Sequence, residues 1–236
     1  MRRAPSAPHG LGWVAAGAWR CLRDPLALTR LVRWRALAEH AGLARGRLVD
    51  VGAGAQPYAP LFRDRVDRIV TVDYPGRAAP PRVDVWGDAQ ALPLRTASAD
   101  TVLCVEVLEY LPDPGAALKE FGRVLRSGGR LLLTAPQLRG MSDEPDDYWR
   151  FGRPGLDRLA RAAGLDDIVI DACGGAAAAW GQHVSSWMYA TLAGRRLPVA
   201  LVRSVCGLLQ APCWLVEQAG AGRGVTLHWL LTARKP

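Results

Sequence analysis

The sequence predicts an α/β protein built on one open sheet with helices on both faces. Short runs of β-branched and apolar residues, such as RLVDVG (47–52) and RIVTVDY (68–74), are typical of buried parallel strands. Helix-start residues, beginning with Asp113-Pro114, separate later runs of this kind. Strands that alternate with helices through short loops indicate right-handed crossovers in one sheet.

Seven strands are expected, each a short apolar run bounded by polar or turn residues. The first two runs are followed by RVDVWGDA (82–89) and DTVLCVEV (100–107), which predict the third and fourth strands. RLLLTAP (130–136) predicts the fifth strand, DIVIDA (167–172) the sixth, and GVTLHWLLTARKP (224–236) the seventh.

Two helices are expected between the fourth and sixth strands. The first begins after the helix-capping residue Asp113 and is expected to end at the SGG segment, 127–129. Its apolar face is formed by Leu118, Phe121, Val124 and Leu125. The second helix begins at Pro154 and ends at Gly164. Its apolar side is formed by Leu156, Leu159, Ala160 and Ala163.

Both ends of the chain are expected to add helices to this core. We expect one domain over residues 1–236, with a basic helical arm at 1–44, the sheet core at 45–174, a helical insert or cap at 175–222 and the final strand at 223–236. One helix of the insert is expected to carry an apolar stripe formed by Leu201, Val202, Val205, Leu208 and Leu209. Arg203, Gly207 and Gln210 are expected opposite that stripe. Pro212 is expected to break or kink the same helix.

The net charge of +8 is distributed unevenly along the 236 residues. Residues 1–47 hold nine arginines and two acids, and residues 172–236 hold six basic residues and one acid. Residues 48–171 are acidic, with 15 basic and 19 acidic side chains. Seven of the nine tryptophans also fall in the two basic ends. Arginine attracts anionic surfaces and tryptophan favours membrane interfaces, so the ends are candidate membrane-binding arms.

The cysteines favour a reducing, cytoplasmic compartment. There are five, an odd number, and no pair has the C-x-x-C spacing of a zinc or redox site. We therefore expect neither a disulfide framework nor a bound metal. The apolar run near the N-terminus is short and lacks a small-x-small cleavage site, so export is not expected.

A glycine-rich loop, DVGAGAQPY (50–58), follows the first predicted strand. A dinucleotide fingerprint would place its third glycine at position 57, where this chain has Pro57. No lysine or arginine lies between Val49 and Phe62 to meet a pyrophosphate. Instead, Asp50, Asp73 and Asp88 follow the first three strands in turn, at the sheet edge where ligands bind. Carboxylates there suit ribose hydroxyls, an adenine amino group and the ammonium of an amino acid.

This pattern resembles class I S-adenosylmethionine-dependent methyltransferases of the type-11 family. The resemblance covers about residues 46–175 and the final strand. Its five blocks are LVDVGAGAQPY, IVTVDY, GDAQALPLRTASADTVLCVEVLEYLPDP, LKEFGRVLRSGGRLLLTAP and EPDDYWRFGRPGLDRLARAAGL. The resemblance implies a Rossmann-like seven-stranded sheet whose last strand is antiparallel. Within the family, the Gln56-Pro57-Tyr58 segment is typical of a Pro-Tyr variant of the loop.

The resemblance also implies which residues bind the cofactor, S-adenosylmethionine, and its product S-adenosylhomocysteine. Asp50, Gly52, Ala53 and Gly54 would line the methionine part. Asp73, with Tyr74, would hold the ribose. Asp88 and Ala89 would flank the adenine, and Glu106 would face both cofactor and substrate.

Methyl transfer from a sulfonium needs alignment of the nucleophile, the methyl group and the sulfur. A base is needed only when the acceptor must lose a proton. Related sequences often carry a histidine where this chain has Asp146, which leaves Asp146, Asp147 or Tyr148 as candidate bases. His183 in the insert is a further candidate. Tyr110 also replaces a histidine that is common in the family.

The expected acceptor is a small molecule, a lipid-linked compound or a glycan, in keeping with similar sequences associated with cell-envelope polysaccharide assembly. An anionic membrane surface is a candidate partner, on the inner face of the membrane. A nucleic-acid partner is not expected: the segment CVEVLEYLPDP (104–114) lacks both the Pro-Pro-aromatic sequence of nucleobase amino-methylating enzymes and the Pro-Cys nucleophile of cytosine C5 enzymes.

Three alternatives stay open at this point. The chain could bind S-adenosylmethionine without catalysis and act as a partner subunit, as the departures at Asp146 and Tyr110 allow. The basic arms suggest, more weakly, an RNA methyltransferase. The arms could also simply cover the sheet and the cofactor, with tryptophan as core filler. Sequence does not define the oligomeric state.

Overall fold

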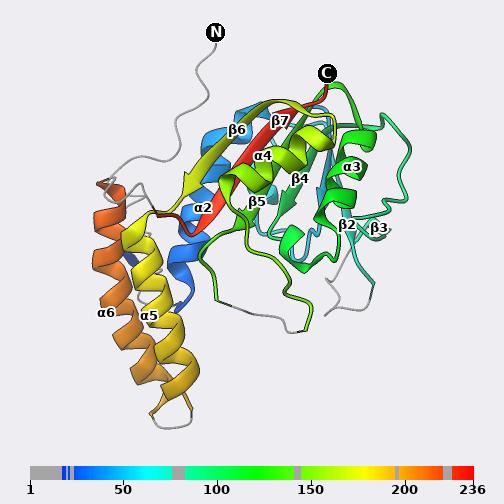
Figure 1. Cartoon of the computed structure of the whole chain (residues 1–236). Helices are drawn as coiled ribbons and strands as arrows, with labels where there is room; N and C mark the ends of the chain where they lie inside the picture. Colours follow the sequence, from blue (N-terminus) through cyan, green and yellow to red (C-terminus); the bar gives the residue numbers. More distant parts are fainter. Residues whose placement is uncertain are drawn as a thin grey trace. The chain divides into compact units, whose positions relative to one another are not determined.

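The computed structural model describes residues 18–19, 21, 24–75, 83–140, 145–194, 197–219 and 225–236. Residues 1–17 of the predicted basic arm therefore lie outside the described residues. The chain forms two compact units, which we treat separately (Figure 1). The sheet unit comprises Leu37–Gln137, Met141–Asp171 and Trp229–Pro236, and the helical unit comprises the chain up to Ala36, Leu138–Gly140 and Ala172–His228. The number of domains and the borders predicted for arm, core, insert and final strand stay predictions.

The sheet has the seven strands predicted from the sequence. They are β1 (Arg47–Val51), β2 (Arg68–Asp73), β3 (Val85–Trp86), β4 (Ala99–Val105), β5 (Leu125–Pro136), β6 (Asp166–Cys173) and β7 (His228–Arg234). Their order across the sheet is β3-β2-β1-β4-β5-β7-β6, and the pairs from β3 to β5 are parallel. The N–H of Gly128, early in β5, donates to the carbonyl of Lys235, just after β7, at 2.8 Å. This pairing of opposite strand ends confirms that β7 is antiparallel.

The strand order reverses at β1, which pairs with β2 on one side and with β4 on the other. In open α/β sheets, the loops that leave the carboxyl ends of strands at such a point separate and open a crevice. The glycine-rich loop follows β1 directly, so the fold places this loop at the crevice.

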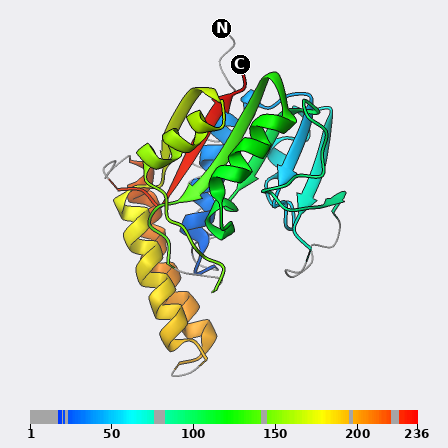
Figure 2. The ribbon, with the colours of Figure 1, turned by 45° about the vertical axis from the view of Figure 1, so that its right-hand side comes forward.

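Helices cover both faces of the sheet, as the sequence predicts. α3 (Pro114–Val124) and α4 (Arg153–Ala162) lie side by side on one face (Figures 1 and 2). The C-terminal turn of α2 (Ala27–His40) and the 3-10 turn Ala41–Leu43 lie on the other face. The carboxylate of Asp113 accepts the N–H of Ala116 at 3.0 Å, which confirms Asp113 as the N-cap of α3.

The predicted end of α3 at the SGG segment is wrong. The helix ends at Val124, because Leu125 already has extended dihedral angles and begins β5. β5 then runs through Ser127, Gly128 and Gly129, and its register against β4 shifts between Ala99 and Thr101. The glycines therefore belong to an irregular strand start, where a bulge is tolerated, and do not terminate the helix.

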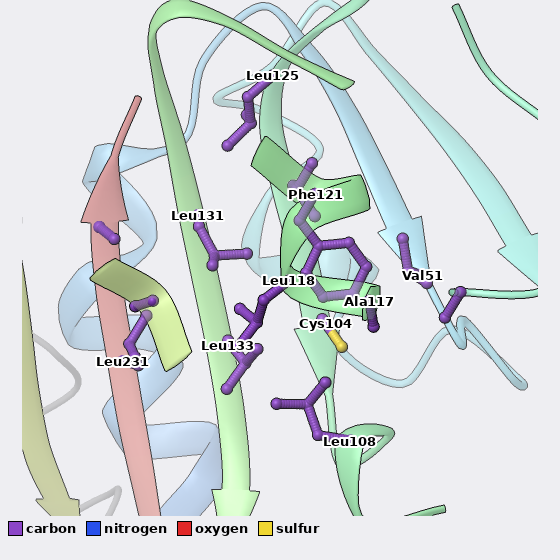
Figure 3. Packing of buried hydrophobic residues seen from close by; sticks show 14 of the residues in the cluster. Val51, Cys104, Leu108, Ala117, Leu118, Phe121, Leu125, Leu131, Leu133 and Leu231 are labelled. Atoms are coloured by element: carbon purple, nitrogen blue, oxygen red, sulfur yellow. The ribbon is translucent and has the colours of Figure 1, made fainter. Parts of the chain in front are cut away.

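The core of the sheet unit lies between α3 and the sheet (Figure 3). Leu118 and Phe121 of α3 lie against Leu131 and Leu133 of β5, and all four side chains are fully buried. Burial of one such side chain stabilises a fold by about 1.5–3 kcal/mol. This packing holds β4 and β5 firmly, and with them the loops that leave their carboxyl ends.

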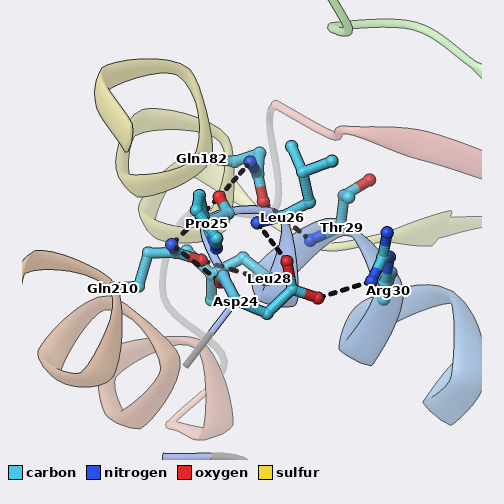
Figure 4. Close-up of polar contacts among 8 residues, drawn as sticks. All are labelled: Asp24, Pro25, Leu26, Leu28, Thr29, Arg30, Gln182 and Gln210. Carbon is cyan, nitrogen blue, oxygen red and sulfur yellow. Dashed lines mark hydrogen bonds and ion pairs between the residues drawn. The ribbon is translucent and has the colours of Figure 1, made fainter. Parts of the chain in front are cut away.

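The helical unit is built from α5 (Ala176–Leu192), α6 (Val199–Gln218) and the first part of α2. Its interior contains Leu28, Ala178 and Trp214, all fully buried. Two buried glutamines connect the helices to the turn before α2 (Figure 4). Gln210 donates to the carbonyl of Pro25 at 3.0 Å and accepts the N–H of Leu28 at 3.2 Å. Gln182 donates to the same carbonyl at 2.9 Å and accepts the N–H of Thr29 at 3.1 Å.

These contacts correct the predicted inner face of α6. Gly207 and Gln210, predicted to lie opposite the apolar stripe, are buried, because Gln210 bonds the α2 turn. From the predicted stripe, Val202 is buried, whereas Leu201 and Leu208 are exposed. Pro212 does not break α6, since the helix continues through it to Gln218. The alternative, a kink at Pro212, stays a prediction.

Candidate functional site

A pocket of about 400 Å³ lies in the sheet unit, beyond the carboxyl ends of β1 to β4. Its size is in the range of small-molecule and cofactor sites, roughly 300–1,000 Å³. It is lined by Val51, Gly52, Asp73, Tyr74, Gly87, Asp88, Ala89, Gln90, Glu106, Val107, Tyr110, Leu111, Pro112, Asp146 and Tyr148. The fold thus brings together eight of the thirteen candidate site residues predicted from the sequence.

The two glycines of the β1 loop have different steric surroundings. Gly52 has φ +71°, and a Cβ there would collide with the side chain of Val107. Gly54 has φ +50°, and no other heavy atom lies within 4 Å of where its Cβ would stand. Gly52 therefore permits close packing inside the protein. Gly54 leaves open space beside the backbone, although it is not among the lining residues.

Asp73 ends β2 and fixes the β1 loop. One carboxylate oxygen accepts the N–H of Gly54 at 2.8 Å, and the other accepts the N–H of Tyr74 at 2.8 Å. Each oxygen has two lone pairs, so both can accept a further bond from a ligand hydroxyl. The Asp73 carbonyl also accepts the N–H of Gly87 at 2.9 Å, which brings the loop after β3 to the end of β2.

Asp50 lies beneath the pocket and does not line it. Its residue is 6% exposed, and burial, with a smaller contribution from Asp73, raises its pKa to about 7. Ala53 is also buried and outside the lining. A contact of Asp50 or Ala53 with the methionine part of a cofactor stays a prediction.

The loop after β3 presents Asp88 and Ala89 to the pocket. Asp88 accepts the N–H of Gln90 at 2.8 Å, which closes a tight turn. A pair of charged residues on α3 holds the continuation of this loop. Glu120 accepts the N–H of Leu92 at 2.8 Å, and Arg123 donates to the carbonyl of Leu92 at 3.0 Å. The turn is therefore fixed by the rigid helix.

Glu106 follows β4 in a left-handed conformation, with φ +56°. Its N–H donates to the carbonyl of Thr134 at 3.2 Å, and its carboxylate accepts the hydroxyl of Thr134 at 3.0 Å. A non-glycine residue held in this region is strained and is often found at ligand sites. β5 thus keeps Glu106 in a conformation that places it in the pocket lining.

Asp146 and Tyr148 line the pocket together, and the hydroxyl of Tyr148 donates to the Asp146 carboxylate at 3.1 Å. The backbone N–H groups of Tyr148 and Trp149 donate to the carbonyl of Glu109, at 2.8 and 3.2 Å. That carbonyl fixes the segment beside the pocket. The sequence offered no signal for this role, because any residue at position 109 has a backbone carbonyl.

Two other candidate bases lie elsewhere. Asp147 forms a bidentate ion pair with Arg150, at 2.6 and 2.8 Å, and its side chain is only 1% exposed. Asp147 is therefore a structural residue. His183 lies on α5 in the helical unit, where its Nδ1–H donates to the carbonyl of Ala179 at 2.8 Å. Neither residue is part of the pocket lining, so a catalytic role of His183 stays a prediction without support from this pocket.

The pocket lining is acidic. Its described residues include Asp73, Asp88, Glu106 and Asp146, and none of them is a lysine, arginine or histidine. These carboxylates favour a ligand with net positive charge over an anionic one. Five further lining residues, not predicted from the sequence, supply apolar walls and backbone: Val51, Gly87, Val107, Leu111 and Pro112.

Comparisons with known proteins agree with this fold and pocket. Residues 49–133 match the type-11 family model, described as a methyltransferase domain. A protein of Mycolicibacterium smegmatis named "Probable S-adenosylmethionine-dependent methyltransferase" is 36% identical over 96 residues, which is 38% of this chain and 37% of that protein. Demethylmenaquinone methyltransferase of Renibacterium salmoninarum is 34% identical over 123 residues, 47% of this chain and 50% of the relative. The chain spans between a fifth and a half of the lengths of the curated relatives it matches first.

Solved structures give the same fold. Phosphoethanolamine N-methyltransferase 2 of Haemonchus contortus, in complex with S-adenosyl-L-methionine, superposes with a TM-score of 0.57 at 15% identity. The match covers 86% of this chain and 52% of that one. The sheet order and the pocket at its switch point define a class I methyltransferase fold. With the matched segment, they identify a class I S-adenosylmethionine-dependent methyltransferase domain of the type-11 family in this chain. The Pro-Tyr form of the loop stays a prediction.

Proposed function

We propose that this chain transfers a methyl group from S-adenosylmethionine to an acceptor that binds in the same pocket. The observation that supports this most is the order of groups around one pocket: the glycine loop after β1, Asp73 after β2, Asp88 and Ala89 after β3, and Glu106 after β4. In our assignment, the first three of these groups follow the cofactor from its methionine end to its adenine end, and Glu106 faces the acceptor.

The residues present fit this cofactor. S-adenosylmethionine carries a sulfonium, an ammonium and one carboxylate, and its net charge of about +1 suits a lining whose described residues include four carboxylates and no basic side chain. We assign Asp73, with Tyr74, to the ribose hydroxyls, and Asp88 with Ala89 to the adenine. Gly52 and Gly54, with Asp50 and Ala53, would lie at the methionine part.

When bound, the cofactor supplies an activated methyl group and its own leaving group. The chain has to align the acceptor, exclude water and, for a hydroxyl or acidic carbon, take up a proton. We propose that Asp146 accepts that proton and that the Tyr148 hydroxyl orients the Asp146 carboxylate through the bond of 3.1 Å. Glu106 would face the acceptor from the carboxyl end of β4.

The charge of the lining restricts the acceptor. A neutral or cationic reacting end is favoured, because none of the described lining residues has a basic side chain that would compensate a phosphate or carboxylate. Small hydroxylated molecules, lipid-linked compounds and glycans all meet this condition. The name of the relative at 34% identity, demethylmenaquinone methyltransferase, makes an apolar ring compound a concrete member of this class. A lipid-linked glycan of cell-envelope polysaccharide assembly, methylated at the cytoplasmic face of the membrane, is another.

Calorimetric titration tests the cofactor half of this proposal. We expect both S-adenosylmethionine and S-adenosylhomocysteine to bind the purified chain with one site each. The sulfonium form should bind more tightly, because only it adds a positive charge to the acidic pocket. If neither compound binds, the proposed function is wrong.

Methyl incorporation tests the acceptor half. The chain is incubated with methyl-labelled cofactor and separated lipid, glycan, small-molecule and RNA fractions of a bacterial extract. We expect label in a lipid, glycan or small-molecule fraction. Label confined to RNA would replace this proposal with an RNA methyltransferase.

A second candidate is a cofactor-binding subunit without catalysis. It is favoured by the place of Asp146 and Tyr110 in the pocket lining, since the family resemblance implies that these two residues replace histidines. Tight cofactor binding, together with no label in any fraction, would support this second function over the first.

A further inference from the structure

The hairpin of α5 and α6 exposes large apolar side chains around its tip. We define the hairpin tip as the described residues between Trp187 and Leu208. Trp187 is 64% exposed and Leu208 is 69% exposed. Between them, Leu197, Val199, Leu201 and Val205 are exposed as well. Trp180, Leu215 and Val216, nearer the other end of the hairpin, are exposed too. The tip holds the larger share of this apolar surface, which is unusual for a region that stays in water.

The opposite face of α6 is already occupied. Val202, Cys206, Gln210 and Trp214 recur every fourth residue and are buried. Gln210 is bonded to the turn before α2, as Figure 4 shows. α6 is long and apolar enough to cross a membrane by length and composition. However, its inner face is committed to protein contacts, so an interfacial position fits it better than a lone span.

The charge of the hairpin has one sign. Residues 176–216 contain no Asp or Glu, and they contain three arginines, Arg195, Arg196 and Arg203. Glu217 follows at the other end of the hairpin, where its carboxylate accepts the N–H of Gly175 at 2.8 Å. The guanidinium of Arg203 lies 6.0 Å from the centre of the Tyr189 ring. These three arginines carry all the formal charge of residues 176–216, so this segment is positively charged.

We propose that the hairpin tip inserts into the headgroup region of an anionic lipid bilayer. The exposed leucines and valines would enter the acyl boundary, Trp187 would lie at the interface it prefers, and Arg203 would meet anionic headgroups. A second copy of the chain fits the same surface less well. It would bring like charges together, with no acidic side chain between residues 176 and 216 to compensate them.

This inference goes beyond methyl transfer, since it requires neither the cofactor nor the acceptor. The amino-acid composition suggested that both basic ends of the chain could bind a membrane. The present inference assigns that contact to one surface, the hairpin tip. Cofactor affinity therefore serves as an independent readout: it should be the same in every variant below, whatever the outcome with lipid.

Vesicle flotation tests the proposal with the full chain. We expect the chain to float with phosphatidylcholine vesicles that contain phosphatidylglycerol, and far less with phosphatidylcholine alone. Binding should weaken at 1 M salt, where the Debye length is only about 3 Å. Absence of binding to the anionic vesicles at low salt would overturn the proposal.

Two substitutions at the tip sharpen the test. Leu201→Ser combined with Leu208→Ser should lower the partition coefficient by about tenfold or more, because two exposed side chains lose their transfer into the interface. Arg203→Glu should lower it by roughly tenfold or more, since each charge near an anionic surface contributes about 1 kcal/mol.

The matched controls are Leu215→Ser, at the other end of α6, and Val169→Ser, on β6. Both residues are exposed, at 51% and 50%, and both variants should bind vesicles like the parent. Equal loss in the controls and the tip variants would overturn the assignment to the tip. A chain that is dimeric by light scattering and becomes monomeric with Leu208→Ser would show instead that a second copy covers this surface.

Discussion

The carboxylate of Asp73 accepts the backbone N–H of Gly54 at 2.8 Å. The end of β2 therefore holds the loop that follows β1, and a single side chain connects the two parts of the proposed cofactor site. A change at Asp73 is therefore expected to act on both the proposed ribose contact and the position of the glycine loop.

We expect Asp73→Asn to lower cofactor affinity by about 10–100-fold, measured by calorimetry. The amide oxygen can still accept the Gly54 N–H, but the charged acceptor for ribose is lost, and hydrogen bonds to charged groups contribute about 1.5–3 kcal/mol. Asp64→Asn is the control, because Asp64 is exposed and outside the pocket. Parent-like affinity of Asp73→Asn would contradict the assignment.

Gly54→Val should abolish cofactor binding and leave the fold intact. No protein atom lies within 4 Å of the new Cβ, so the side chain would project into open space beside the loop. Gly164→Val is a matched control, since Gly164 also has a left-handed backbone, with φ +75°, and equally open surroundings. In both variants, the free energy of unfolding should fall by a similar amount, about 1–2 kcal/mol or more. Only Gly54→Val should lose cofactor binding. Calorimetry and thermal unfolding measure the two effects.

The raised pKa of Asp50 predicts a pH dependence of stability. Its pKa is about 7 in the folded chain and 3.8 ordinarily. Between these values the folded state holds a proton that the unfolded chain has released. The free energy of unfolding should therefore be highest below pH 4 and fall as the pH rises through 7, by a few kcal/mol for this group.

Asp50→Asn removes this titration. Urea unfolding at pH 5 and pH 8 should show a smaller loss of stability in the variant than in the parent. An unchanged pH dependence would mean that Asp50 is ionised in the folded protein.

Asp146→Asn should lower turnover without lowering cofactor affinity. If Asp146 takes the acceptor proton, the loss is about 10²–10⁴-fold. Tyr148→Phe should lower turnover less, and should shift the pH profile, because its hydroxyl donates to the Asp146 carboxylate. The measurement uses the fraction that takes up label from the methyl-labelled cofactor. Equal turnover of Asp146→Asn and the parent would exclude Asp146 as the base.

The neighbouring acid should behave in the opposite way. Asp147→Asn breaks the bidentate bond to Arg150 and should destabilise the fold by about 1–3 kcal/mol, which lowers the melting temperature by several degrees. Cofactor affinity should change little. The exposed pair Asp157 and Arg161 on α4 is the control, and Asp157→Asn should shift the melting temperature much less.

The strands could be predicted well from the sequence, because short, buried, β-branched runs such as β1 and β4 seldom form another secondary structure in a compact fold. It failed where two tendencies compete locally. The SGG segment reads as a helix stop, but the chain had already entered β5 at Leu125. In α6, apolar residues do recur at helical spacing, but this spacing does not show which face of the helix packs against the rest of the protein. Gln210 decides this, through its bonds to the turn before α2.

The candidate site could also be predicted from the sequence only in part. Asp73, Asp88 and Glu106 were predicted because they follow strands whose carboxyl ends meet at one edge. Asp146 and Asp147 are neighbours of the same residue type, so the sequence cannot distinguish their roles. In the structure, Asp147 is bonded to Arg150, whereas Asp146 lines the pocket. Sequence alone could not show that Asp50 would be covered, because its depth depends on how the loop folds over it.

The order of strands has a consequence for how the sheet is completed during synthesis. β6 stands at the sheet edge, and its neighbour there is β7. The whole of α5 and α6 is translated between these two strands. When β6 has been synthesised and β7 has not, the sheet is therefore incomplete. One edge of β5 is unpaired, and β6 has no neighbouring strand to which it can form hydrogen bonds. Exposed strand edges of this kind favour misassembly, so the emergence of β7 closes both gaps at once.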